Sequence, residues 1–350
     1  LGTDWHIDQM KYACNESAPL DLSIGKSQYL YGTNEYVPIL DIREEVMDIR
    51  DVMAIFRHPK AKAPMSSGRK VDYIPSRKIS VPVNRENVIK YGILDAKYSD
   101  MIPDSIILTI PKTKDYLSKP ELFMLDLLSS YQWDRPLHLL NMGGDIEIGL
   151  KEYLEYQGYS YKFVPIRNKT NSTYAGFCDT DRLYHLLTEV YKWDDLRRDD
   201  YFIDYQNMYT NLGVMSVRNV FVTSADAFIR AGEKERALEM LDKCVEVMAN
   251  YPLETISLGF SGNVVTSISL IEKYFALGAA DKARSLSVRM ANELLVSTRF
   301  YMEFYEFAKD SFEMCANAIY YLEDALKEAG EKELAEQVVS RLKSLVGQAS

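Results

Sequence analysis

The stretch FIRAGEKERALEMLDKC, residues 228–244, contains a glycine five residues before an alanine, between two apolar stripes of helical spacing. A glycine at the end of a helix adopts the left-handed conformation that reverses the chain at low steric cost. An alanine early in the next helix allows the two helices to pack closely. The stretch therefore predicts a helical hairpin with Gly232 in its turn and Ala237 in its contact.

The same spacing returns at Gly278 and Ala283, and again at Gly330 and Ala335. Each copy has apolar residues three and four positions apart on both sides of its glycine, which is the spacing of one helix face. In the first copy these residues are Val217, Val220, Phe221, Ala225 and Phe228, then Leu238, Leu241, Cys244, Val245 and Met248. Three hairpins in succession predict an all-α repeat domain over residues 217–350.

The first hairpin resembles the tetratricopeptide repeat, because aromatic, glycine, alanine, bulky and small residues occur in the order of that motif. These are Phe228, Gly232, Ala237, Leu241 and Cys244. The glycines are 46 and then 52 residues apart, whereas that repeat has a period of about 34 residues. The domain is therefore best described as TPR-like, with longer helices or turns, and an unrelated helical bundle with glycine turns remains the alternative.

Residues 1–180 show a different pattern, in which apolar runs of strand length alternate with helical stretches. The expected strands are Lys78–Val83, Ile106–Ile110, Pro136–Asn141 and Tyr159–Ile166, and the expected helices are Lys119–Tyr131 and Ile146–Tyr156. This alternation is typical of an α/β layer domain. Residues 181–216, rich in aspartate and aromatic residues, are interpreted as a linker between the two domains.

Composition excludes several classes of partner and site. The net charge is -10 without a long Lys/Arg block, so nucleic acid is not an expected partner. No run of eighteen apolar residues occurs, so no spanning segment is expected in this chain. Its four cysteines form no CxxC pair, so neither a zinc site nor a disulfide framework is predicted. The absence of an initiator Met indicates a piece of a larger protein.

The first candidate site lies in the segment DWHID, residues 4–8. Asp4, His6 and Asp8 alternate, so on an extended chain they would converge on a metal ion, while on a helix Asp4 and Asp8 would share a face. No second histidine lies within helical reach of His6, and a capping role for Asp4 is favoured. No metal site is predicted, and Asp4, Trp5 and Asp8 are candidate ligand- or partner-binding residues.

The second candidate is NMGGD, residues 141–145, between an expected strand and an expected helix. Free backbone amides at such a position bind phosphate or sugar groups. The segment matches no nucleotide-binding fingerprint, and a tight turn with Asp145 capping the following helix is favoured. Gly143 and Gly144 are candidate binding residues.

Trp133 and Arg135 form the third candidate, because tryptophan and arginine are enriched at binding hot spots. A core position for Trp133 is the favoured alternative. The chain contains no GxSxG elbow and no phosphate-binding loop. We therefore assign no catalytic residue and no cofactor.

Four stretches together resemble a known family. They are TDWHIDQM near Asp4, the run from Tyr29 to Ile39, the run from Ser129 to Ile166 with its WDRP segment, and the helical repeats after Val217. They are similar to the C-terminal soluble region of large multi-span membrane proteins abundant in Bacteroidetes. Those proteins resemble GT-C glycosyltransferases and are related to protein O-mannosyltransferases, which use lipid-linked sugars.

The resemblance implies an accessory domain on the periplasmic side of the inner membrane, with its own membrane-embedded domain as a partner. The catalytic acid and the lipid-sugar site would lie in that membrane domain, so no catalytic residue is carried over to this chain. The helical stack would offer a groove to a polypeptide acceptor or partner. Two alternatives remain: a stand-alone periplasmic enzyme with a pocket at the strand ends near Gly143 and Gly144, and a purely structural scaffold.

Overall fold

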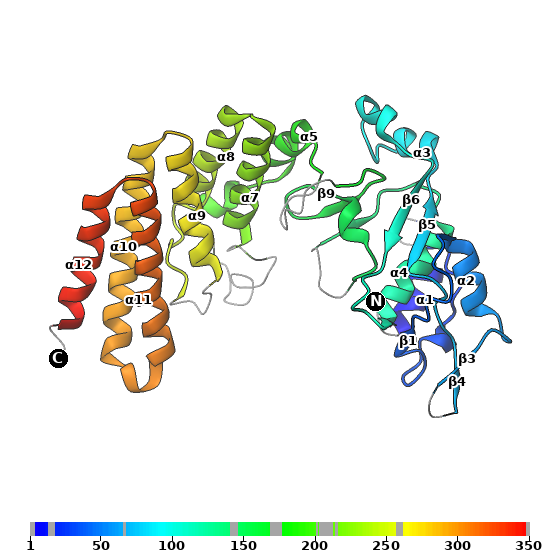
Figure 1. The fold of residues 1–350 in the computed structure, drawn as a ribbon. Helices are drawn as coiled ribbons and strands as arrows, with labels where there is room; N and C mark the ends of the chain where they lie inside the picture. The colour runs from blue at the N-terminus through cyan, green and yellow to red at the C-terminus, as the bar shows by residue number, and fades with distance from the viewer. Residues whose placement is uncertain are drawn as a thin grey trace. The chain divides into compact units, whose positions relative to one another are not determined.

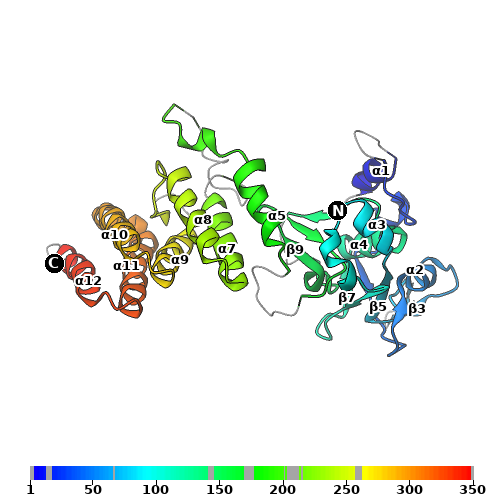
Figure 2. The same ribbon diagram turned by 90° about the horizontal axis from the view of Figure 1, so that it is seen from above.

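The chain divides into two compact units, Leu1–Asp179 and Thr180–Ser350 (Figures 1 and 2). The computed structural model describes residues 4–12, 18–65, 68–140, 146–168, 177–200, 202, 213, 216–256 and 262–347. The first unit mixes strands and helices and the second is helical. The predicted fold class is confirmed.

The first unit contains short strands and a few helices. Its helices are α1 (Asp4–Tyr12), α2 (Ile49–Arg57), α3 (Arg85–Lys90) and α4 (Lys119–Ser130). Its strands are β1 (Tyr36–Pro38), β2 (Met47–Asp48), β3 (Ala63–Pro64), β4 (Lys70–Val71), β5 (Lys78–Pro82), β6 (Ser105–Thr109), β7 (Tyr116–Ser118), β8 (His138–Leu139), β9 (Leu154–Tyr156) and β10 (Tyr161–Phe163). Short 3-10 turns are η1 (Lys26–Gln28), η2 (Ala96–Met101) and η3 (Leu150–Tyr153).

The strands pair into small separate sheets rather than one layer. In the sheet β2-β5-β6, β5 runs parallel to β2 and antiparallel to β6. Ile79 of β5 pairs with Leu108 of β6, and both side chains are fully buried. The sheet β8-β10-β9 is antiparallel, and β1 pairs with β7 and β3 with β4. Helix α4 contacts α2 and is buried over most of its length, so it forms the centre of the unit.

The helix expected over Ile146–Tyr156 is wrong. Gly149 has a φ of 89°, and a Cβ there would lie 2.6 Å from the backbone nitrogen of Thr109. This close approach to β6 requires glycine, and the left-handed backbone ends any helical path. The chain forms the short turn η3 and then β9 instead. Asp145, expected to cap that helix, lies outside the described residues.

Two buried polar side chains of α4 hold the segment 23–35. The ammonium of Lys119 donates to the carbonyls of Tyr29 (3.0 Å) and Leu30 (3.1 Å) and to the carboxylate of Glu35 (2.7 Å). The carboxylate of Asp126 accepts from the backbone of Ile24 (2.8 Å) and from the hydroxyl of Ser23. Burial raises the pKa of Asp126, and these hydrogen bonds offset only part of that shift.

The buried carboxylate of Asp126 should make the stability of the first unit pH-dependent. A raised pKa in the folded state means that the folded protein binds more protons than the unfolded chain, so stability falls as pH rises above the ordinary value of 3.8. The slope cannot exceed about 1.4 kcal/mol per pH unit for one group. Asp126→Asn lacks this titration. The unfolding free energy of the variant minus that of the parent should therefore increase from pH 4 to pH 7, measured by urea denaturation at each pH. A constant difference between the two proteins would contradict this expectation.

The second unit is a row of antiparallel helices (Figures 1 and 2). They are α5 (Thr180–His185), α7 (Ser216–Ala231), α8 (Lys234–Val247), α9 (Gly262–Ala276), α10 (Ala280–Glu303), α11 (Tyr305–Glu328) and α12 (Lys332–Gly347). A π-helical turn, η4 (Leu186–Val190), and a 3-10 turn, η5 (Asp194–Arg197), follow α5. Helix α5 contacts α7 and η5 contacts α8, so the interval interpreted as a linker contributes elements to the helical unit.

The glycine turns repeat in detail. Gly232, Gly278 and Gly330 have φ of 80°, 82° and 84°. In each turn the glycine N–H donates to the carbonyl three residues earlier (3.0 Å), and the next N–H donates to the carbonyl five residues earlier (2.9 Å). This pattern is the Schellman motif. The alanines that follow, Ala237, Ala283 and Ala335, are fully buried, so the three predicted hairpins, α7–α8, α9–α10 and α11–α12, are confirmed.

Candidate functional site: a polar pocket beside helix α8

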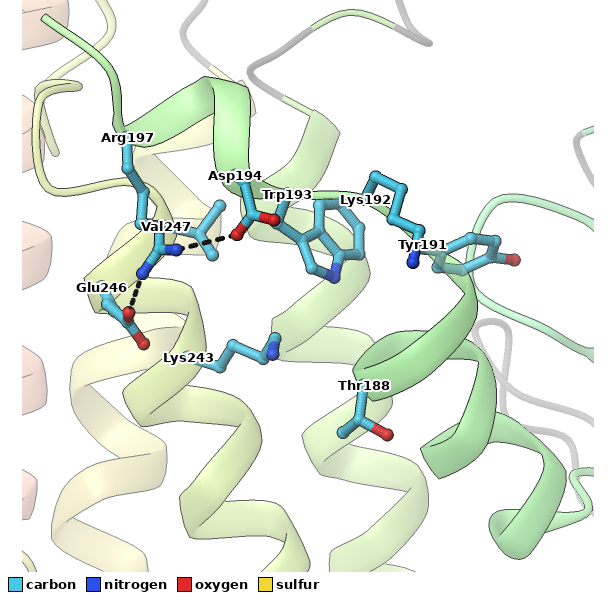
Figure 3. A pocket seen from close by; sticks show the side chains of 9 residues that line it. All are labelled: Thr188, Tyr191, Lys192, Trp193, Asp194, Arg197, Lys243, Glu246 and Val247. Carbon is cyan, nitrogen blue, oxygen red and sulfur yellow. Dashed lines mark hydrogen bonds and ion pairs between the residues drawn. The ribbon is translucent and has the colours of Figure 1, made fainter.

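A small pocket lies between the segment 188–197 and α8 in the helical unit (Figure 3). Its volume is about 120 Å³. That is the space of about four water molecules, well below the roughly 300 Å³ of pockets that enclose a drug-sized ligand. The lining residues are Thr188, Tyr191, Lys192, Trp193, Asp194, Arg197, Lys243, Glu246 and Val247. The pocket therefore fits a single side chain or a small ion.

Two aromatic residues form one wall. The chain leaves the π-helical turn at Tyr191, whose N–H donates to the carbonyl of Leu186 (2.8 Å). The Trp193 indole N–H donates to the carbonyl of Leu187 (2.8 Å), and the ring contacts Phe221 of α7 at 4.9 Å between centroids. Trp193 is thereby held in place, with the Tyr191 ring edge-on beside it at 5.7 Å.

Most, but not all, of the charged side chains that line the pocket have a partner. Arg197 donates to Asp194 (2.8 Å) and to Glu246 of α8, so both carboxylates already have a cation. Lys192 donates to the carbonyl of Glu189 at the pocket edge (3.1 Å). Lys243 extends from α8 into the hollow below the Trp193 ring (Figure 3). Among the described residues we find no hydrogen-bond or ion-pair partner for Lys243.

This arrangement suits an anionic group. An ammonium donates charge-assisted hydrogen bonds to a carboxylate, and these bonds are stronger than neutral ones. The Trp193 ring would contact the methylene groups of an acidic side chain. Arg197 already pairs with Asp194 and Glu246, so Lys243 is the ammonium that an incoming acid would contact. The pocket is therefore complementary to one carboxylate at a time.

None of the pocket residues was selected by the sequence analysis, which assigned residues 181–216 to a linker. The available signal was the alternation of aromatic and charged residues over Tyr191–Arg197. That alternation has neither the helical nor the strand period, and it does not show that Lys243 lies nearby.

The first predicted candidates lie on α1. The Asp8 carboxylate is 3.1 Å from the Lys26 ammonium, and this contact raises the pKa of Lys26, with a smaller contribution from Asp4. The face that Asp4 and Asp8 share is therefore already occupied by a cation. The side chains of Trp5 and His6 lie outside the described residues. In the described part of the chain, no group of His, Cys, Asp and Glu is arranged to hold a metal ion.

Trp133 is fully buried, as the core interpretation requires. Its ring stacks on Phe163 at 5.1 Å, and its N–H donates to the carbonyl of Pro82 (2.8 Å). Arg135 donates to the carbonyl of Ala18 (2.7 Å) and so fixes the segment before η1. Both residues make intramolecular contacts that hold the first unit together.

Gly143 and Gly144, the remaining predicted candidates, lie outside the described residues.

The chain thus combines a mixed α/β unit with a row of helical hairpins that carries a small polar pocket. The family described as TMEM260-associated domain 2 matches residues 1–182, which is just over half of the chain. The chain belongs to this family, whose domain is associated with a membrane protein. No curated protein and no solved structure matches the chain. Within the described ranges, no helix is long and apolar enough to cross a membrane.

Proposed function

We propose that this chain is an accessory domain of a membrane glycosyltransferase-like protein, on the periplasmic side of the membrane, and that its helical unit binds a polypeptide acceptor or partner. The family match supports the association with a membrane protein. The resemblance carried by residues 3–10 and 129–166 supports the glycosyltransferase context. Its own membrane-embedded domain is then the partner of the first unit.

The pocket beside α8 is the observation that carries the binding proposal. A polypeptide crossing the helical unit would place an acidic side chain between Lys243 and Lys192, against the ring of Trp193. A volume of about 120 Å³ fits the carboxylate and methylene groups of Asp or Glu. The rest of the polypeptide would lie on the helical surface. Its contacts there would add affinity without specificity for the polypeptide's sequence.

Synthetic peptides that differ only at one central residue, Glu, Gln or Lys, test this proposal by fluorescence anisotropy. We expect the Glu peptide to bind about five- to tenfold more tightly than the Gln peptide, the scale of one hydrogen bond to a charged group at a partly exposed site. Lys243→Met should remove this preference, because it removes the ammonium and keeps much of the side-chain volume.

Lys234→Met is the matched control. Lys234 is an exposed residue on the same helix, outside the pocket, and the substitution changes the net charge by the same amount. It should leave the Glu preference intact. If the parent bound the Glu and Gln peptides equally, or if Lys243→Met and Lys234→Met lost the Glu preference to the same extent, the pocket would not recognise an acid. Either result would favour a scaffold role for the helical unit.

A further inference from the structure

Helices α10 and α11 are longer than their neighbours. Each has 24 residues, whereas α9 has 15 and α12 has 16. At 1.5 Å per residue the excess over α12 is about 12 Å. Gly278 precedes α10 and Gly330 follows α11, so the extra turns lie at the opposite end, where the two helices meet at Phe304. Figure 1 shows this connection extending beyond the ends of α9 and α12.

The projecting end carries exposed aromatic side chains. Phe300 is 56% exposed, Phe304 49%, Tyr305 43% and Phe307 90%, and we call these four residues the aromatic tip. The rings of Phe300 and Phe304 are 5.1 Å apart. The helical path of α11 is interrupted at Ala308, directly after Phe307. The four side chains therefore place exposed aromatic surface at the projecting end of α10 and α11.

The charged residues around the tip largely pair with one another. Arg299 lies 4.0 Å from Glu303, and Lys309 lies 3.6 Å from Glu313. Two further acidic residues lie on the first turns of α11: Glu306 and Asp310. The tip thus has a slight negative charge and no basic cluster, so electrostatic attraction does not direct it to an anionic surface.

The exposed area of the tip indicates the kind of partner. An aromatic side chain has about 150 to 250 Å² of surface, so these four expose roughly 360 to 600 Å² at their measured fractions. A stable protein interface buries about 800 Å² on each side, more than the tip offers to a second copy of this chain. Insertion into a bilayer interface has no such threshold, and aromatic side chains are enriched there.

We propose that the aromatic tip inserts into the headgroup region of a lipid bilayer with neutral headgroups. The family match over residues 1–182 links the chain to a membrane protein, and the proposal takes a bilayer to lie near this chain. The projection of α10 and α11 lets the tip reach that bilayer before the other helices of the unit. The proposal does not depend on the pocket beside α8, which lies on other helices.

Flotation with phosphatidylcholine vesicles tests the proposal with the whole chain. We expect the parent protein to float with the vesicles and Phe307→Ser to lose about tenfold in partition coefficient, the scale of one phenylalanine withdrawn from apolar surroundings. Tyr31→Ser is the control, because Tyr31 is 99% exposed in the first unit, and it should float like the parent. Adding phosphatidylglycerol should not strengthen binding, since the tip has no basic cluster.

A second variant reads the position of the tip directly. Phe307→Trp should keep or strengthen vesicle binding, and vesicles should shift its fluorescence to the blue relative to the parent, whose three tryptophans give the baseline. The proposal would be overturned if the parent did not bind vesicles, if Phe307→Ser bound them as well as the parent, or if binding required anionic lipid. So would a dimer, measured by light scattering, that Phe307→Ser dissociates without changing flotation.

Discussion

Replacing Trp133 with alanine should lower the unfolding free energy of the first unit by about 3 to 5 kcal/mol, the usual cost of removing a large aromatic side chain from a core. The substitution removes the stacking on Phe163 and leaves the carbonyl of Pro82 without the indole N–H. Urea denaturation monitored by circular dichroism measures the change.

Two controls separate packing from hydrogen bonding at this position. Trp133→Phe keeps an aromatic ring against Phe163 and loses the hydrogen bond, so about 1 to 3 kcal/mol of stability should be lost. Tyr31→Ala, at a 99% exposed position, should stay within about 0.5 kcal/mol of the parent. A loss below 1 kcal/mol for Trp133→Ala would mean that this tryptophan does not support the core.

Replacing Ala237 with leucine should destabilise the helical unit by about 1 to 3 kcal/mol, because extra methylene groups must enter a close helix contact. Ala237 is fully buried on α8, where α8 packs against α7. Thermal unfolding followed at 222 nm should show an earlier transition for this unit.

Glu235→Gln tests whether the effect comes from packing. Glu235 is exposed, two residues from Ala237 on the same helix, and its variant should stay within about 0.5 kcal/mol of the parent. If both variants melted together, the close packing of the α7–α8 hairpin would lose its support.

The helical hairpins were predictable because their determinants are local. A glycine in the left-handed conformation and an alanine five residues later act within a single turn, so Gly232, Gly278 and Gly330 identify the turns without knowledge of the rest of the fold. The expected helix over Ile146–Tyr156 failed for the opposite reason. Its apolar residues have helical spacing, but contact between Gly149 and the backbone of Thr109, 40 residues earlier, determines the backbone there.

The pocket was beyond sequence reasoning for a similar reason. Trp193 and Lys243 meet across 50 residues of chain, and no periodicity in the segment around Trp193 indicates which helix it covers. Trp133 was easier to interpret, because a tryptophan between a leucine-rich helix and a strand is usually buried. Its specific partners, Pro82 and Phe163, became clear only from the structure.

The order of contacts in the helical row determines how it would respond to mechanical load. Helix α12 contacts chiefly α11 and α10, and α9 joins this group to α7 and α8. Each hairpin is therefore held by its immediate neighbours, as in other linear repeat structures. A pull on the C-terminal end would peel α12 away first and release the remaining hairpins in sequence.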